Sequence, residues 1–278
     1  MPAKETPEDP AALDSYVIAH GETGRARLRV LAEVMAAGSE DLIRRVGIAP
    51  GAQCLDVGCG GGDTSVLLAR HVGPAGRVVG VDLDPVVLAA ARREAETLDL
   101  PQLSYEQANV LDLPGAASFD VVYARFLLTH LPDPQDAIAK MSACLRPGGL
   151  IVLEDIDFSG HFVYPPCPPF DAYLRLYRAT VRKAGGDPDI GPRLPLLLKA
   201  AGLREVDLQV RQPVALEGAA KLISPITLDA IGARAVAAGF ASPDEIEQIA
   251  DALFAAARDH NIVMSAPRIV QSWGRVPL

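Results

Sequence analysis

Aromatic residues, cysteines and basic residues are all scarce in this 278-residue chain. Its 26 Lys and Arg against 35 Asp and Glu give a formal net charge of −9. This charge argues against a nucleic-acid or membrane-surface partner, because both favour a basic face. The four cysteines form no C-x-x-C pair, which favours a reduced, cytoplasmic protein over a disulfide scaffold. No apolar run approaches the ~18 residues of a membrane span, and the N-terminal residues lack the apolar stretch of a signal peptide.

Hydrophobic residues are abundant at 49%, so the chain can bury a full core as one enlarged domain. After Pro50-Gly51, short apolar runs alternate with helical patterns, and this alternation predicts a parallel sheet covered on both faces. The expected strands are 53–57, 77–82, 103–108, 119–124 and 150–155, and the expected helices are 63–72, 85–98 and 134–145. Before them we expect a helix over 23–37 and a second one opening at Ser39. Pro147-Gly148-Gly149 predicts a hard stop before the next strand.

A glycine-rich stretch follows the first expected strand. Residues 54–64 read C-L-D-V-G-C-G-G-G-D-T, and such a turn lets a ligand approach the backbone at a helix N-terminus. The dinucleotide pattern G-x-G-x-x-G would place its third glycine where this chain has Asp63. A carboxylate there would repel a pyrophosphate. With Asp56 behind the loop, the site suits a neutral or cationic ligand part, such as the ammonium and sulfonium of S-adenosylmethionine.

Asp82 ends the second expected strand, where a carboxylate can accept hydrogen bonds from both ribose hydroxyls. A nicotinamide enzyme needs the same acid, so that interpretation stays open. A purely structural glycine turn is a third interpretation.

Taken together, these motifs resemble the class I S-adenosylmethionine-dependent methyltransferases, and most of all their small-molecule branch in quinone biosynthesis and natural-product tailoring. The resemblance is close over residues 50–157 and extends in pattern to 193–213 and 268–276. It is carried by L-D-V-G-C-G-G-G, V-V-G-V-D-L-D, Q-A-N-V-L-D-L-P, S-F-D-V-V-Y-A-R-F-L-L-T-H-L-P-D-P and L-R-P-G-G-L-I-V-L-E-D. It implies an α/β, Rossmann-like doubly wound, mostly parallel seven-stranded sheet with helical lid inserts.

The resemblance also implies a set of cofactor contacts. Asp56, Gly58 and Gly60 would contact the methionyl part, Asp82 the ribose, and Leu83, Asn109 and the Val110 backbone the adenine. Asn109 stands where the family usually has aspartate, and its carbonyl can still accept from the adenine amino group. Arg125 is a candidate for the cofactor carboxylate, with a bridge to Asp155 as its structural alternative. Tyr16 belongs to an N-terminal segment that in similar enzymes folds over the cofactor.

Two inserts interrupt the expected core. We expect a tail and cap helices over 1–49, a cofactor-binding core over 50–156, a lid insert over 157–192, core again over 193–214, a helical insert over 215–260 and the last core strand over 261–278. In the helical insert, Ser242 and Glu245 have the spacing of a capping box. The lid insert concentrates aromatic residues, namely Phe158, Phe162, Tyr164, Phe170, Tyr173 and Tyr177. Together they predict an enclosed, largely apolar acceptor pocket. For Tyr173, Leu174 and Tyr177 the alternative is that they pack the lid's own core.

Methyl transfer needs a base only if the acceptor must lose a proton, and histidine titrates in the right range. The candidates are His20, next to the cofactor in the N-terminal segment, and His130, after the fourth strand. A structural hydrogen bond is the alternative role for His130. Asp155 is a third candidate. With Glu154 and Asp157 it forms an acidic strand end. Such carboxylates are usually solvated or hydrogen-bonded to the lid, and binding of a divalent metal is the less favoured interpretation.

The sequence therefore predicts a cytoplasmic methyltransferase acting on a small, largely hydrophobic molecule at an oxygen, nitrogen or carbon atom. An NAD-dependent oxidoreductase and a non-catalytic S-adenosylmethionine-binding protein are the alternatives. We expect a small-molecule acceptor, no nucleic acid, no membrane and no metal, and a homodimer stays open.

Overall fold

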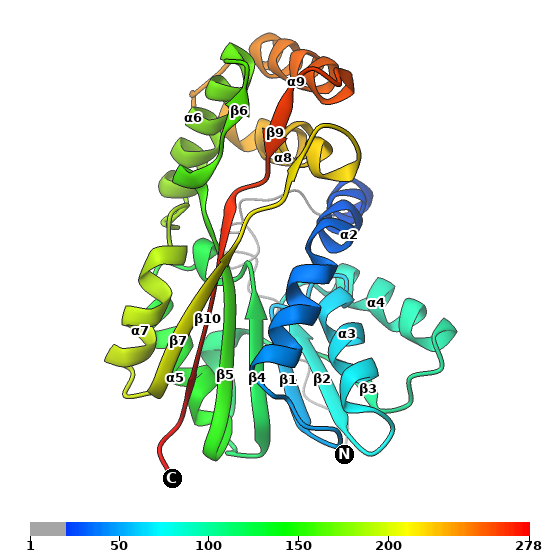
Figure 1. Cartoon of the computed structure of the whole chain (residues 1–278), viewed down its shortest axis with the longest axis vertical. Coiled ribbons are helices and arrows are strands. Elements are labelled where there is room, and N and C mark those ends of the chain that lie inside the picture. The colour runs from blue at the N-terminus through cyan, green and yellow to red at the C-terminus, as the bar shows by residue number, and fades with distance from the viewer. Residues whose placement is uncertain (1–20) are drawn as a thin grey trace.

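The computed structural model describes residues 21–278, and its centre is a seven-stranded sheet (Figure 1). The strand order is β3-β2-β1-β4-β5-β10-β7. The strands are β1 (Gln53–Val57), β2 (Arg77–Asp82), β3 (Leu103–Gln107), β4 (Phe119–Arg125), β5 (Leu145–Asp157), β7 (Arg204–Arg211) and β10 (Arg268–Arg275). β10 runs antiparallel to β5 and β7, and the other pairs are parallel. The expected mostly parallel, seven-stranded sheet is confirmed.

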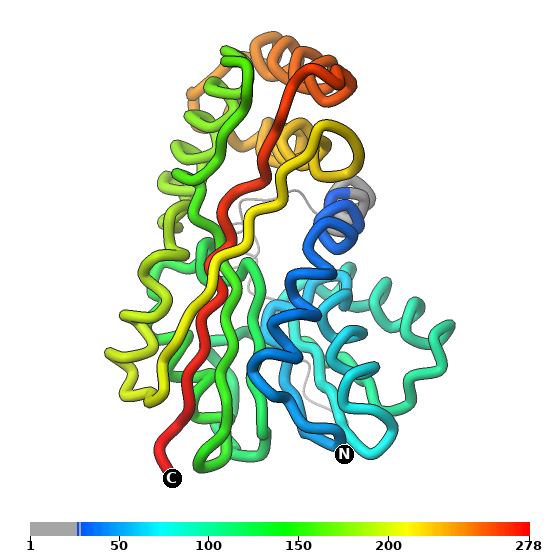
Figure 2. Tube along the Cα trace, viewed as in Figure 1, coloured from blue at the N-terminus to red at the C-terminus, as the bar shows by residue number. Residues whose placement is uncertain are grey.

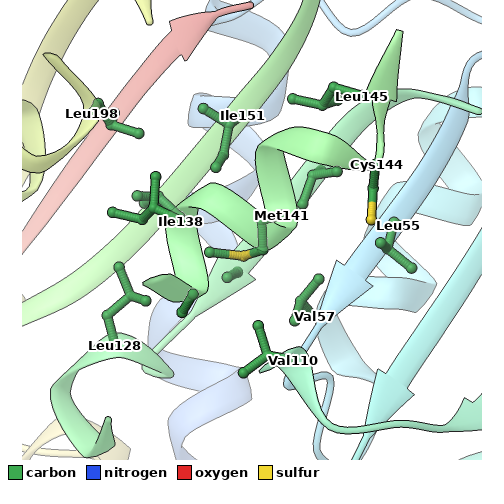
Figure 3. Close-up of a cluster of buried hydrophobic side chains, with 14 of the residues drawn as sticks. Leu55, Val57, Val110, Leu128, Ile138, Met141, Cys144, Leu145, Ile151 and Leu198 are labelled. Atoms are coloured by element: carbon green, nitrogen blue, oxygen red, sulfur yellow. The ribbon is translucent and has the colours of Figure 1, made fainter. Parts of the chain in front are cut away.

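Helices cover both faces of this sheet. They are α2 (Gly21–Arg45), α3 (Asp63–Val72), α4 (Pro85–Thr97), α5 (Pro134–Ala143) and α7 (Leu194–Ala200). Cys54 of β1 packs in the core under α2 and α3, whereas its neighbour Leu55 packs with α5 and α7 on the opposite face. Met141 of α5 belongs to the same buried cluster as Leu55 and Val57 (Figure 3). Burying one such side chain contributes roughly 1.5–3 kcal/mol, so a strand that is apolar on both sides requires both layers.

A second layer, which we call the roof, lies at the carboxyl ends of the parallel strands (Figure 1). It comprises α6 (Pro168–Lys183), α8 (Ala219–Ala237), α9 (Pro243–Arg258) and a small sheet of β6 (Val163–Tyr164), β9 (Val263–Ser265) and β8 (Val214–Ala215). The roof has an apolar core of its own, to which Phe158, Phe170, Tyr173, Leu228, Leu253 and Met264 belong. The predicted capping box at Ser242 and Glu245 is confirmed at the start of α9.

One long helix connects the two layers. The predicted break at Ser39 is wrong, because α2 continues from Gly21 to Arg45. The Ser39 hydroxyl donates a 2.7 Å hydrogen bond to Glu154 and accepts a 3.2 Å one from Arg125, so it is engaged with the sheet instead of capping a new helix. Along its length α2 packs on α8 of the roof and on α3 beside the sheet (Figure 2).

Pro147-Gly148-Gly149 also differs from expectation. The tripeptide lies inside β5 instead of preceding the start of that strand. Leu145 pairs with Phe119 of β4, and the next paired residue on β5 is Leu150, opposite Val121. The residues between them form a bulge, a place where proline and glycine are tolerated within a strand. No helix within residues 21–278 is long and apolar enough to cross a membrane.

Candidate active site

A cavity of about 210 Å³ lies between the carboxyl ends of the parallel strands and the roof. The sheet contributes the glycine loop and the ends of β2 and β4. The roof contributes Phe158, Tyr173, Tyr177, Ile223 and Thr227, and α2 contributes Arg27, Leu31 and Met35. The acidic side chains of the lining lie at the sheet end, whereas the roof end is mostly apolar.

The glycine loop has a backbone that other residues adopt only with strain. Gly58, Gly60 and Gly62 have φ values of 69°, 52° and 86°. A Cβ at Gly62 would lie 2.2 Å from the Tyr105 hydroxyl oxygen, and one at Gly58 would lie 3.0 Å from Leu127. Gly62 is also the N-cap of α3 and offers no side chain to its first turn. The loop therefore presents bare backbone and a helix N-terminus to the cavity, an arrangement that suits a carboxylate.

Asp82 organises this loop as well as facing the cavity. Its carboxylate accepts a 2.8 Å hydrogen bond from the Gly60 amide and a 3.0 Å one from the Asp84 amide. Burial raises its pKa above the usual range. The two backbone amides thus already hold this carboxylate in place. A bound ribose could donate hydrogen bonds from its hydroxyls to it without moving it.

Asp56 and Asp63 add two more acids to the sheet end of the cavity. Asp56 accepts a 2.6 Å hydrogen bond from the Ser65 hydroxyl, and burial raises its pKa to about 6. Burial likewise raises the pKa of Asp63, while the Arg125 guanidinium acts in the opposite direction on both acids. Because a buried carboxylate is stabilised by a nearby positive charge, this end of the cavity suits a cationic ligand group.

The adenine positions expected from the sequence also lie on the cavity. Leu83, Asn109 and Val110 line it, together with Val87 and Ala108. The Asn109 side-chain oxygen accepts a 3.0 Å hydrogen bond from the Leu111 amide, which fixes the direction of the amide group. These residues form a mainly apolar slot with one polar edge, as a purine requires.

Arg125 lies on the cavity and does not bridge to Asp155. Its guanidinium donates to the Ser39 hydroxyl and lies 5.7 Å from the centre of the Phe126 ring. Asp155 instead accepts hydrogen bonds from the Thr129 amide, at 3.1 Å, and the Ile156 amide, at 2.8 Å. Arg125 thus remains placed for an anionic group of a ligand.

Of the two expected catalytic residues that the structure describes, His130 lies on the cavity wall and Asp155 does not. Burial, with a contribution from the Arg27 guanidinium, lowers the pKa of His130 to about 3. Asp155 is absent from the wall, because its side chain turns beneath the loop and holds the Thr129 amide. Burial raises its pKa to about 7. The structure therefore gives Asp155 a role in holding the loop, in place of the expected contact with the acceptor. His20 lies outside the described residues, as does Tyr16 of the cofactor set.

The acidic strand end at 154–157 is divided among separate partners. Glu154 accepts hydrogen bonds from Ser39, Tyr123 and Gln271. Asp157 pairs with Arg268 through 2.9 Å and 2.5 Å contacts. Within residues 21–278 no three His, Cys, Asp or Glu side chains are grouped to hold a metal ion.

The lid aromatics divide into three sets. Phe158, Tyr173 and Tyr177 line the cavity, and the Phe158 and Tyr177 rings stack at 3.9 Å. Phe170 is buried in the roof core. The expectation for Phe162 and Tyr164 is wrong, because they are 44% and 69% exposed. Phe162 directly precedes β6, and Tyr164 belongs to it. Both sequence interpretations of Tyr173 and Tyr177 therefore hold, since the two rings pack the roof core and wall the cavity.

Arg27 and Thr227 line the cavity but carry no recognisable signal in the sequence. They are 200 residues apart, and the Arg27 Nε donates a 3.3 Å hydrogen bond to the Thr227 hydroxyl. Neither residue stands in a motif, so only the packing of α2 against α8 brings them together.

Comparison with known proteins agrees with this geometry. Residues 54–149 match the methyltransferase domain family. The demethylmenaquinone methyltransferase of Oceanobacillus iheyensis is 35% identical over 114 residues, which are 41% of this chain and 48% of that protein. The chain thus spans about half the length of that relative. Methyltransferase str2 of Strobilurus tenacellus is 28% identical over 243 residues, with 83% of this chain and 82% of that protein covered.

A solved structure shares the fold at low sequence identity. It is the phosphoethanolamine N-methyltransferase 2 of Haemonchus contortus in complex with S-adenosyl-L-methionine, with a TM-score of 0.55 and 15% identity. The match covers 87% of this chain and 53% of that chain. These matches show a methyltransferase domain over residues 54–149 and a fold shared with the solved structure, in agreement with the glycine loop and the strand order.

Proposed function

We propose that this protein is an enzyme that transfers the methyl group of S-adenosylmethionine to a small, largely hydrophobic acceptor. The observation that carries the proposal is a single cavity with two unlike ends. Its sheet end has four acids (Asp56, Asp63, Asp82 and Asp84) beside a bare glycine loop, and its roof end is walled by Leu31, Ile156, Phe158 and Ile223. A cationic cofactor and an apolar acceptor can therefore meet inside it.

The residues of the sheet end fit the cofactor group by group. We assign Asp82 to the ribose hydroxyls, the slot at Leu83 and Asn109 to the adenine, and Asp56 to the ammonium, and all four residues line the cavity. We assign Arg125 and the α3 N-terminus to the carboxylate. When bound, the cofactor supplies an electrophilic methyl group on its sulfonium. The chain's contribution is to hold the acceptor in line with that group and to exclude water, which accounts for much of the catalysis of a displacement.

The acceptor class follows from the roof end of the cavity. Its apolar walls support a hydrophobic molecule, and the name of the Oceanobacillus relative points to a quinone precursor as one example. The methylated atom is oxygen, nitrogen or carbon, and a place in natural-product biosynthesis is consistent with the resemblance to tailoring enzymes. If the acceptor must lose a proton, His130 is the candidate base on the wall, where its low pKa keeps the imidazole neutral at physiological pH.

Calorimetry with S-adenosylmethionine and with NAD tests the cofactor. We expect micromolar binding of the first and none of the second, and the reverse result would favour the oxidoreductase alternative. Incubation with S-adenosylmethionine and a collection of hydrophobic acceptors, followed by mass spectrometry of S-adenosylhomocysteine, tests the transfer. A protein that binds the cofactor but forms no product with any acceptor would fit the non-catalytic alternative.

We further propose that the enzyme works in the cytoplasm on a free small molecule and not on nucleic acid. The four cysteines are all unpaired thiols, which supports a reducing compartment. The net charge of −9 supports the exclusion of nucleic acid. Light scattering at working concentration would decide between a monomer and the homodimer left open above.

A further inference from the structure

A polar cluster stands at the roof end of the cavity, inside otherwise apolar walls. Arg27 of α2, Tyr173 of α6, Thr227 of α8 and His130 of the short 3-10 turn Leu128–His130 all line it. Arg27 donates to the Thr227 hydroxyl at 3.3 Å. Four elements from distant parts of the sequence therefore bring their polar groups to one place.

Two members of this cluster lack a partner that would satisfy them. The Tyr173 hydroxyl is buried, with 0% exposure of the residue. The Thr227 and Ser224 side chains lie near it, but it makes no hydrogen bond of regular geometry within the described part of the chain. Among the side chains that the structure describes, no carboxylate lies within ion-pair distance of Arg27. A buried hydroxyl without a hydrogen bond is costly, and native structures retain few of them. Such a pair points to a ligand that completes it.

The charges around the cluster determine which ligand fits. Burial lowers the pKa of His130 and raises that of Tyr173, so the imidazole is neutral and the phenol keeps its proton at physiological pH. The cluster then offers a guanidinium and a hydroxyl as donors and carries one positive charge. Asp56, Asp63 and Asp82 lie at the opposite, sheet end of the cavity. Apolar neighbours such as Leu31 and Ile223 lower the local dielectric and strengthen any charge pairing.

We propose that Arg27 and Tyr173 bind an anionic oxygen of the acceptor, so that the acceptor is a small hydrophobic molecule carrying one ionised acid group, a carboxylate or an enolate. This inference rests on the proposed function, because it assigns the acceptor of the same cavity. The methionyl cation of the cofactor and the acceptor anion would then occupy the acidic and the basic end of one cavity.

Binding of matched probes to the full chain, saturated with S-adenosylhomocysteine, tests this. The first pair is 2-naphthoate with the uncharged 2-naphthamide, and the second is 2-hydroxy-1,4-naphthoquinone, ionised at neutral pH, with its 2-methoxy ether. We expect the ionised member of at least one pair to bind about 10-fold or more tightly than its neutral partner, the scale of a hydrogen bond to a charged group. Because the protein carries a net charge of −9, a general attraction for anions cannot produce that preference.

Three variants test whether Arg27 and Tyr173 cause the preference for the ionised probe. Arg27→Gln should bring the ratio of the two affinities close to one, and Tyr173→Phe, which removes only the hydroxyl, should reduce it severalfold. Arg44→Gln is the matched control, because it removes the same charge from the same helix at a position 61% exposed and paired with Glu40 and Asp41. All three should bind S-adenosylhomocysteine like the wild type.

Equal affinity for the ionised and neutral probes, or a preference that survives in Arg27→Gln, would overturn the inference. Failure of both ionised probes, 2-naphthoate and 2-hydroxy-1,4-naphthoquinone, to bind would overturn it as well. The cofactor measurement separates this from the proposed function, since loss of S-adenosylhomocysteine binding in the wild type would contradict the methyltransferase proposal itself. If Arg27→Gln does not fold, the volume-conserving Tyr173→Phe decides alone.

Discussion

A buried histidine in the roof predicts that the protein loses stability in mild acid. His161 packs against the rings of Phe158, Phe170 and Tyr173, with centroid distances of 4.5, 5.6 and 6.1 Å. Its Nδ1 lies 3.1 Å from the Ser265 carbonyl, so this nitrogen carries the proton, and its buried Nε2 finds no partner within residues 21–278. Burial lowers the pKa of His161 from 6.5 to about 3.

The size of the loss follows from the difference between these two pKa values. At pH values between the two pKa values, His161 is protonated in the unfolded chain and neutral in the folded chain. The free energy of unfolding therefore falls as the pH is lowered. From pH 7 to pH 4.5 this linkage lowers the stability by about 2.5 kcal/mol through His161 alone. The loss begins near pH 6.5 and stops growing below pH 3, where the folded protein also binds the proton.

His161→Phe removes the titrating group and keeps a ring of similar size. At pH 7 we expect the variant to be about 1 kcal/mol less stable, because the hydrogen bond to Ser265 is lost. At pH 4.5 it should be about 1.5 kcal/mol more stable than the wild type, by the same linkage. Reversible urea unfolding at both pH values measures the two differences. His260→Phe is the control for the substitution, since the His260 side chain is 73% exposed.

Parallel pH dependence in the wild type and in His161→Phe would refute this reasoning. It would mean that the imidazole is protonated in the folded state and reaches a partner, for instance through a water molecule. The roof would then tolerate a positive charge, and the description of this layer as an apolar enclosure for the acceptor would weaken with it.

Three more outcomes test the site. Asp82→Asn should lower the affinity for S-adenosylmethionine at least about 10-fold in calorimetry, whereas Glu106→Gln, an exposed charge on β3, should not. Gly62→Ala should reduce the free energy of unfolding by about 2 kcal/mol or more, because its φ is 86° and its Cβ would meet Tyr105; unchanged urea unfolding would contradict the described loop. Residues 157–192 should exchange amide hydrogens faster than the sheet without acceptor and slow down on binding; uniformly slow exchange would show a fixed wall.

Local sequence patterns were sufficient for the sheet and for the cofactor end of the site. The central strands β1, β2 and β4 are short apolar runs, and α4 and α5 begin at Asp84 and Asp133, which cap them. The run of glycines predicts the positive φ values of the loop. These signals act within a few residues of each other. The same signals gave Asp56, Asp82 and Asn109 as candidates, and all three line the cavity, while their contacts with a cofactor stay predictions.

The roof end was not predictable in the same way, because its signals act between distant segments. Arg27 and Thr227 look like ordinary positions of amphipathic helices until α2 meets α8. Ser39 resembles a helix start, and only its contacts with Glu154 and Arg125 explain why the helix continues. Phe162 and Tyr164 show the opposite error, since aromatic composition does not say which side chains of a segment face outward.

The two ends of the cavity share one structural element, and this links cofactor and acceptor binding. Ser39 of α2 holds the Arg125 guanidinium at the cofactor end and is itself fixed by the buried Glu154 carboxylate. Twelve residues earlier on the same unbroken helix, Arg27 stands at the acceptor end. A continuous helix transmits displacement along its axis, whereas two helices joined at Ser39 would not. The position of Arg27 at the roof end of the cavity therefore depends on how α2 packs against the sheet. The continuity of α2 through Ser39, which the sequence did not predict, is what couples the two ends.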